Sequence, residues 1–151
     1  MATEARQFCT FYLDEYYFGI DVQVVQEVNL RRQLTPVPLA PPVVRGILNL
    51  RGQIVTTMDL RRRLELPEES RPDEPVHIVL RAGDELVNVL VDAIDEVIEV
   101  RGEDFERAPD TLQGVARELI LGAYKLPERL LLVLDPEKTV ELESVPSDTD
   151  A

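Results

Sequence analysis

The sequence has one cysteine, one histidine and no tryptophan in 151 residues. A lone Cys9 excludes an intramolecular disulfide and a thiolate-rich zinc site, which fits a reducing cytoplasm. No stretch approaches the roughly 18 consecutive apolar residues of a membrane span. The opening MATEARQF also lacks the apolar stretch of a signal peptide. We therefore expect a soluble cytoplasmic protein.

Positive charge is scarce as well. The chain has 29 acidic and 16 basic residues, which gives a net charge of −13. A field of that sign disfavours nucleic acid and anionic membrane surfaces, so a protein partner is expected. Aromatic residues make up only 5% of the chain, and aliphatic side chains must therefore build the core. A chain of this length buries roughly 68–70% of its unfolded surface and needs no disulfide or metal to fold.

Alternating β-branched segments predict strands that pair as hairpins. The predicted strand pairs are 8–13 with 16–20, 46–50 with 53–60, one within 76–91 and one within 118–135. Valines at helical spacing in DVQVVQEV (21–28) predict a short helix of one or two turns, with Asp21 as its N-cap. Asp59 and Asp135 are placed to cap two further short helices. The proline-rich stretch after residue 28 predicts an irregular segment.

The pattern of the first half starts again in the second half. Residues 18–28 align without gaps to 87–97 at an offset of 69 (96 − 27), and residues 46–66 align to 122–142 at an offset of 76 (122 − 46). Both copies run in the order hairpin, Val-rich short helix, polar stretch and strand pair ending in Asp. The repeat predicts two all-β units of about 70 residues, each a small barrel, that share an aliphatic core.

The repeat also sets the expected boundaries and singles out one turn. We expect a domain at 7–142, with subdomains at about 7–66 and 76–142, a charged linker at 67–75 and a disordered tail at 143–151. Where copy one has NLRGQ, copy two has KLPER, so Arg51-Gly52 is replaced by Pro127-Glu128. The barrel itself does not demand an Arg-Gly turn, which suggests a surface used for recognition.

At these residues the sequence resembles the CheW family, the adaptor proteins of bacterial chemotaxis. The resemblance rests on FYLDEYYFGIDVQVVQEV, TPVPLAPPVVRGILNLRGQIVTTMDLRRRLEL, VLVDAIDEVIEV and GAYKLPERLLLVLD, and covers about residues 7–142. It implies two SH3-like five-stranded β-barrels around a shared hydrophobic core. It also implies a non-enzymatic scaffold that couples the histidine kinase CheA, through its regulatory domain, to the cytoplasmic tips of methyl-accepting chemotaxis receptors. The implied location is the receptor array beneath or near the inner membrane, with no cofactor.

The resemblance implies a receptor-binding site as well. Glu27 matches the family glutamate that pairs with the arginine of the NLRG turn, here Arg51. Asn49 and Gly52 match the rest of that turn, and the last members, Val25 and Gly46, match positions that line the receptor groove between the barrels. The kinase contact is located less sharply, on an apolar surface of the first barrel, and the second barrel supplies another contact.

The sequence also allows two alternative hypotheses about function, an enzyme and an adaptor of a related pathway. An enzyme is improbable, because His77 is the only histidine, no phosphate-binding glycine loop follows a strand, and metal ligands would have to be carboxylates alone. His77 and Cys9 are interpreted as structural, and the arginines at 61–63 as a solvated helix end. An adaptor of a related chemosensory pathway, such as surface motility or a non-chemotactic kinase system, would carry the same surfaces.

Overall fold

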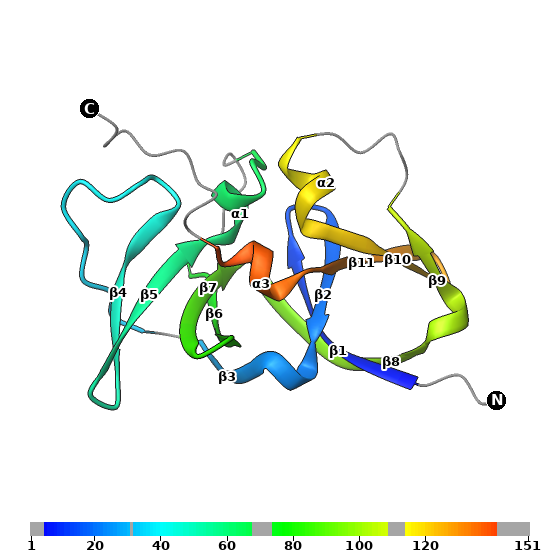
Figure 1. The fold of residues 1–151 in the computed structure, drawn as a ribbon, viewed down its shortest axis with the longest axis horizontal. Coiled ribbons are helices and arrows are strands. Elements are labelled where there is room, and N and C mark those ends of the chain that lie inside the picture. Colours follow the sequence, from blue (N-terminus) through cyan, green and yellow to red (C-terminus); the bar gives the residue numbers. More distant parts are fainter. Residues whose placement is uncertain (1–4, 31, 68–73, 109–113, 142–151) are drawn as a thin grey trace.

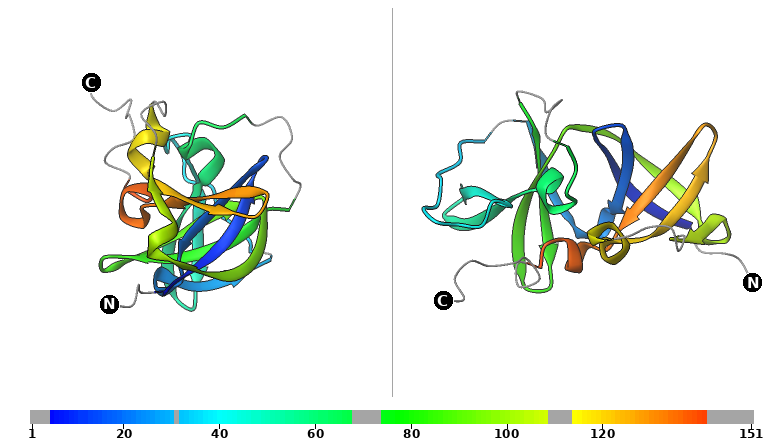
Figure 2. Two further views of the ribbon diagram at one scale, coloured as in Figure 1. Left: turned by 90° about the vertical axis from the view of Figure 1, so that its right-hand side faces the viewer. Right: turned by 90° about the horizontal axis from the view of Figure 1, so that it is seen from above.

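A computed structural model describes residues 5–30, 32–67, 74–108 and 114–141. Within these ranges the chain forms two β-sheets that lie side by side along the long axis (Figures 1 and 2). The strands are β1 Ala5–Leu13, β2 Tyr16–Asp21, β3 Val25–Asn29, β4 Val44–Leu50, β5 Gln53–Asp59, β6 Val76–Ala82, β7 Glu85–Val91, β8 Ala93–Arg101, β9 Phe105–Arg107, β10 Ile120–Leu126 and β11 Arg129–Leu134. The helices are η1 Val22–Val24, α1 Leu60–Arg63, η2 Gly102–Asp104, α2 Val115–Leu119 and α3 Pro136–Thr139. The predicted all-β class with short helices is confirmed, and one sheet has a sixth strand.

The two sheets exchange hairpins between the halves of the chain. One sheet has the order β8-β1-β2-β11-β10-β9 and the other has the order β3-β6-β7-β5-β4. The first hairpin, β1–β2, therefore pairs with strands of the second half, and the β6–β7 hairpin pairs with strands of the first half. The predicted division into consecutive units at 67–75 does not describe this strand membership. Whether the halves act as subdomains stays a prediction, because 68–73 and the predicted tail lie outside the described residues.

Strand register confirms the internal repeat. β5 pairs in parallel with β7 through Thr56 opposite Val87, and β11 pairs in parallel with β2 through Leu132 opposite Phe18. The two contacts are related by the sequence offsets, since 56 + 76 = 132 and 87 − 69 = 18. Each half of the chain thus contributes one hairpin to the sheet of the other half, and the two exchanged hairpins occupy equivalent positions.

The same correspondence corrects the helix predicted at 21–28. Asp21 does cap a helix, but η1 is a single 3-10 turn that ends at Val24, and β3 follows at once. Val28 of β3 lies opposite Ile78, just as Val97 of β8 lies opposite Cys9. The stretch read as polar in the second copy is therefore a long strand, β8. Valine is stiff at χ1 and favours strands, and an available sheet edge decides between strand and helix in both copies.

The core is shared between the sheets, as predicted. Phe11 and Leu13 of β1 belong to the same buried cluster as Met58 of β5, Ile78 of β6 and Val89 of β7, and each is at most 1% exposed. Fully burying an aliphatic or aromatic side chain of this size contributes about 1.5–3 kcal/mol. Neither sheet could close this cluster alone, so the two sheets fold as one body.

Two of the arginines at 61–63 are buried, and their interpretation as a solvated helix end is wrong. Arg61 is 2% exposed and donates from Nε and Nη2 to the two carboxylate oxygens of Asp92 at 2.8 and 2.5 Å. Arg63 donates to the carbonyl oxygens of Thr139 and Lys138 at 2.9 and 2.8 Å. Both side chains cross from α1 to the other half of the chain. Their partners lie 31 and about 75 positions away in sequence, which local pattern reasoning cannot detect.

The predicted helix caps are confirmed. The Asp59 carboxylate accepts a hydrogen bond from the Arg62 backbone N–H, and the Asp135 carboxylate accepts from those of Glu137 and Lys138. These bonds satisfy N–H groups that the first turn of a helix leaves without a partner. In the parts of the chain described here, no helix is long and apolar enough to cross a membrane.

Candidate partner-binding site

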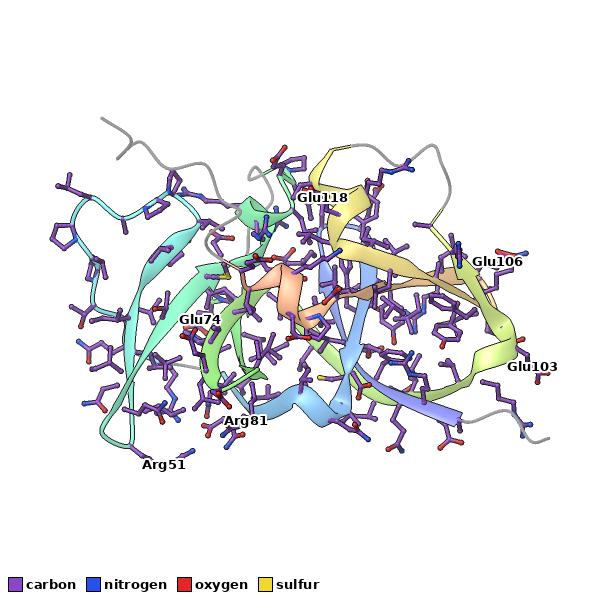
Figure 3. All side chains as sticks on the ribbon, viewed as in Figure 1. Arg51, Glu74, Arg81, Glu103, Glu106 and Glu118 are labelled. Atoms are coloured by element: carbon purple, nitrogen blue, oxygen red, sulfur yellow. The ribbon has the colours of Figure 1, made fainter. Side chains whose placement is uncertain are left out.

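The turn between β4 and β5 is tight and holds Arg51 at the tip of the hairpin (Figure 3). Arg51 and Gly52 both have positive φ, at 51° and 89°, which matches the type I′ turn of two-residue hairpins. The Asn49 side chain accepts a hydrogen bond from the Gly52 N–H at 2.8 Å and fixes the turn from inside. The sequence predicted positive φ for Gly52 only. Arg51 also has a positive φ, a backbone conformation that is energetically unfavourable for an L-residue with a side chain.

Glu27 on β3 reaches across to this turn. Its carboxylate accepts a hydrogen bond from Arg51 Nη2, one from Asn29 Nδ2 at 2.9 Å and one from Arg32 Nη2 at 3.3 Å. The Glu27 side chain is 20% exposed and that of Arg51 is 67% exposed. Glu27 is therefore the anchored member of the pair. Arg51 is oriented by it and still presents most of its guanidinium, a planar group with five N–H donors, to the outside.

Hydrogen bonds from Asn29 and Arg51 lower the pKa of Glu27 below its ordinary value of 4.5. A carboxylate with a depressed pKa contributes stability above its unfolded pKa and loses it as the pH falls through the folded pKa. We expect Glu27 to stay ionised between about pH 5 and about pH 8 and to release Arg51 only in more acidic solution. A carboxyl-detected NMR titration measures this directly. Asn29→Ala should move the midpoint back toward 4.5, and a wild-type midpoint at or above 4.5 would contradict the assignment.

Gly46 supports the site through the backbone. A Cβ placed on Gly46 would lie 2.6 Å from the carbonyl oxygen of Thr35, too close for any side chain. The next residue, Ile47, exchanges two backbone hydrogen bonds with Thr35, at 2.9 and 2.8 Å. Gly46 thereby lets the proline-rich segment dock on β4. Val25 of β3 packs partly buried against the core and pairs with Leu80.

The structure brings four of the six predicted site residues together. Glu27 and Arg51 meet directly, and Asn49 and Gly52 shape the turn. Among the described residues, no hydrogen bond or ion pair joins Val25 or Gly46 to this cluster. Sequence reasoning missed two participants that orient the Glu27 carboxylate, Asn29 and Arg32. The sequence signal for these two residues was the polar run NLRRQ, which follows QEV at the end of β3.

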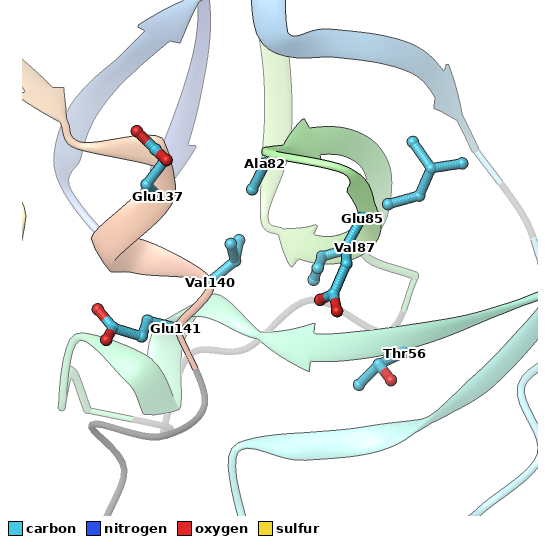
Figure 4. Close-up of a pocket in the computed structure, with 8 residues that line it drawn as sticks. Thr56, Ala82, Glu85, Val87, Glu137, Val140 and Glu141 are labelled. Atoms are coloured by element: carbon cyan, nitrogen blue, oxygen red, sulfur yellow. The ribbon is translucent and has the colours of Figure 1, made fainter.

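A separate pocket lies where the sheets meet, between α3, the start of β7 and β5 (Figure 4). Apolar side chains of Val87 and Val140 line it together with the carboxylates of Glu85, Glu137 and Glu141. Glu27 and Arg51 do not line this pocket. The Arg51 turn and the junction pocket are therefore separate surface features of the protein.

The lone histidine and cysteine are core residues, as interpreted from the sequence. His77 is 4% exposed, and its Nδ1 lies 2.9 Å from Nδ2 of Asn88. Burial, and secondly the charge of Arg32, lower the pKa of His77. Cys9 is 5% exposed, and burial raises the pKa of its thiol, which disfavours the reactive thiolate.

Comparison with known proteins agrees with the family resemblance of the sequence. The family model of the CheW-like domain matches residues 7–144. The chain is 33% identical over 143 residues to the chemotaxis protein CheW of Klebsiella aerogenes, covering 95% of this chain and 86% of that protein. It is 32% identical over 139 residues to CheW of Treponema pallidum, covering 89% and 82%. The crystal structure of the scaffolding protein TtCheW from Thermoanaerobacter tengcongensis superposes with a TM-score of 0.83 at 24% identity, covering 91% of this chain and 94% of that one.

Proposed function

Because this chain belongs to the CheW family, a family of chemotaxis scaffold proteins, we propose that it couples chemotaxis receptors to the histidine kinase CheA. The proposed partners are the regulatory domain of the kinase and the cytoplasmic tip of a methyl-accepting receptor. The proposed location is the cytoplasmic receptor array. The observation that carries the proposal is the Arg51 turn, anchored by Glu27, in a chain that matches the family over residues 7–144.

The geometry of the turn supports the receptor as the partner at this site. A receptor tip is helical, and helices are commonly recognised by an apolar groove whose polar rim sets orientation. We assign the receptor contact to Glu27, Asn49, Arg51 and Gly52 at the turn, and we include Val25 and Gly46 as its other two members. Arg51 is held in one orientation before binding, so less conformational entropy is lost when its guanidinium meets an acceptor on the helix.

A scaffold role needs a second surface that is available at the same time. Exposed apolar residues of the first half of the chain supply a candidate for the kinase, namely Ile54 on β5 at 62% and Leu39, in the segment between β3 and β4, at 101% exposure. Large apolar side chains exposed to this degree commonly mark protein contacts when they cluster. Ile54 lies on the same hairpin as Arg51, so the proposed receptor and kinase contacts would share one rigid element. No catalytic step is proposed for either surface.

The proposal is tested by pairwise binding of the purified chain. Isothermal calorimetry with the kinase regulatory domain and, separately, with a helical receptor fragment should give one saturable site for each partner. Ile54→Ser should weaken only the kinase arm. Absence of binding in both arms would overturn the proposal and would favour a partner from another chemosensory pathway.

A further inference from the structure

The second sheet carries its own arginine at the turn that corresponds to the Arg51 turn. β10 and β11 are joined by Pro127 and Glu128, and Arg129 follows directly. Proline holds φ near −65°, while Glu128 has a φ of 97°, which together match a type II turn. Glu128 occupies the position of Gly52, since 128 − 76 = 52, and glycine would adopt this φ with less strain. The turn keeps a glutamate where its conformation favours glycine.

Arg129 is held in place by two aromatic rings and a carboxylate. Its guanidinium lies 3.7 Å from the centroid of the Tyr17 ring and donates a hydrogen bond to the Tyr12 hydroxyl. Its Nη2 lies 3.7 Å from a carboxylate oxygen of Asp95, and the Tyr17 hydroxyl donates to the same oxygen at 2.9 Å. The Tyr17 hydroxyl oxygen also lies 3.0 Å from Oγ1 of the fully buried Thr10, and this contact places the cluster against the interior of the sheet. The Arg129 side chain remains 44% exposed within this rigid setting.

The two arginine–carboxylate pairs occupy corresponding places in the repeat. Arg129 corresponds to position 53, two residues after Arg51, because 129 − 76 = 53. Asp95 corresponds to position 26, one residue before Glu27, because 95 − 69 = 26. In each sheet an arginine at or next to the tip of the equivalent hairpin, β4–β5 or β10–β11, thus meets a carboxylate on the equivalent strand, β3 or β8. The second copy lacks the Arg-Gly pair, but it still has an arginine–carboxylate pair near this hairpin tip, formed by different residues.

A cleft adjoins Arg129 at the turn between β10 and β11. Ile98, Leu126 and Pro127 line it with apolar surface, and the side chains of Glu99 and Glu128 line it with carboxylates. Neither glutamate forms an ion pair with another residue in the described parts of the chain. Arg129, the one cation at the cleft, is already beside Asp95. The cleft therefore combines an apolar surface with two uncompensated negative charges.

We propose that this cleft is a second recognition site, which binds a protein segment that presents a lysine or arginine next to an apolar side chain. The apolar side chain packs on Ile98 and Leu126, while the cation meets Glu99 and Glu128. Charge complementarity favours this occupant over an acidic segment, because both free charges at the cleft and the net charge of −13 are negative. The unfavourable φ of Glu128 then has a function, since glycine would relax the turn and remove one of the two carboxylates.

The test uses the full chain, labelled with ¹⁵N, and two capped peptides with the core sequences Leu-Lys-Leu-Lys and Leu-Glu-Leu-Glu. The lysine peptide should shift the amide signals of Ile98, Glu99, Leu126, Glu128 and Arg129 in a saturable way, and the glutamate peptide should not. Glu128→Gly should weaken the lysine peptide at least about tenfold, as expected for the loss of one charge-assisted bond. The same variant should melt no lower than wild type, because its turn is relaxed. If Glu128 had only a structural role, Glu128→Gly would not weaken peptide binding while leaving the melting temperature at or above that of wild type.

Glu103→Gln is the matched control, because Glu103 is exposed on η2 and does not line the cleft. It removes the same charge from an exposed residue that does not line the cleft, and it should change the affinity less than about twofold, because salt weakens the attraction between exposed charges that make no direct contact. The proposal is overturned if Glu103→Gln weakens binding as much as Glu128→Gly, because attraction would then be a property of the whole acidic surface. It is equally overturned if the shifted amides lie away from the cleft or if Glu128→Gly keeps full affinity.

Discussion

Arg51→Ala is expected to weaken binding of the proposed receptor fragment by about thirtyfold or more, while the protein stays folded. Truncating one partner of a charged interface pair costs about 2–5 kcal/mol of binding free energy. The Arg51 side chain is 67% exposed, so its pair with Glu27 contributes little to the free energy of unfolding. Calorimetric titration and a thermal melt, run on the same preparation, measure the two quantities.

Arg6→Ala is the matched control for this experiment. Arg6 also forms an exposed ion pair, with Asp21 at 3.2 Å, and its side chain is 46% exposed. It removes the same charge from a surface away from the β4–β5 turn and should leave receptor binding nearly unchanged. Equal losses from both variants would show a general charge effect, and a full loss of folding in Arg51→Ala would show that the pair is structural.

Asp92→Ala is expected to have the largest effect on stability, lowering the free energy of unfolding by about 3–5 kcal/mol. The substitution leaves the Arg61 guanidinium, which is 2% exposed, without its bidentate carboxylate. An arginine guanidinium is not deprotonated in proteins, so Arg61 keeps its charge after the substitution and cannot escape this penalty. The change also removes the acceptor of the Asp14 backbone N–H, at 2.7 Å, a bond that joins the β1–β2 turn to the connection between β7 and β8.

Urea denaturation of Asp92→Ala and of Asp21→Ala compares the stability lost with a buried ion pair to the stability lost with an exposed one. Asp21 pairs with Arg6 on the surface, and it also accepts a hydrogen bond from the Gln23 N–H. Its removal should cost about 1 kcal/mol, typical of a cap and a surface pair together. A loss below about 1 kcal/mol for Asp92→Ala would contradict the view that the Arg61–Asp92 pair holds the two halves together.

Much of the fold could be predicted from the sequence, because strand periodicity and turn residues are local signals. The hairpin around Arg51-Gly52, the caps at Asp59 and Asp135 and the repeat offsets were all predicted, and the resemblance to the CheW family is confirmed. The exchange of hairpins was not predicted. It depends on which sheet edge each hairpin meets, and such a choice between equivalent edges leaves no mark in local sequence. The valines of β3 and β8 fit helix spacing and strand preference alike, and strand pairing decided between them.

The candidate site was predicted in part for the same reason. Glu27 and Arg51 could be paired only through the family resemblance, since nothing in their spacing of 24 positions requires contact. Asn29 and Arg32, which orient Glu27, read as unremarkable polar residues until the geometry showed their shared acceptor. Arg61 illustrates the opposite error, because a charged run was assumed to be solvated when its partner lay in the second copy. Long-range polar contacts of this kind become visible only in the folded molecule.

The most direct test of the coupling role is a three-component sedimentation experiment. Membrane-bound receptor fragments, the kinase regulatory domain and this chain are mixed, and the amount of kinase domain that sediments with the receptor is measured. The proposed role predicts that the kinase domain sediments only when the wild-type chain is present and stays in solution with Arg51→Ala. If the kinase domain sediments equally with either protein, or with neither, the chain does not couple the two partners through the Glu27–Arg51 turn.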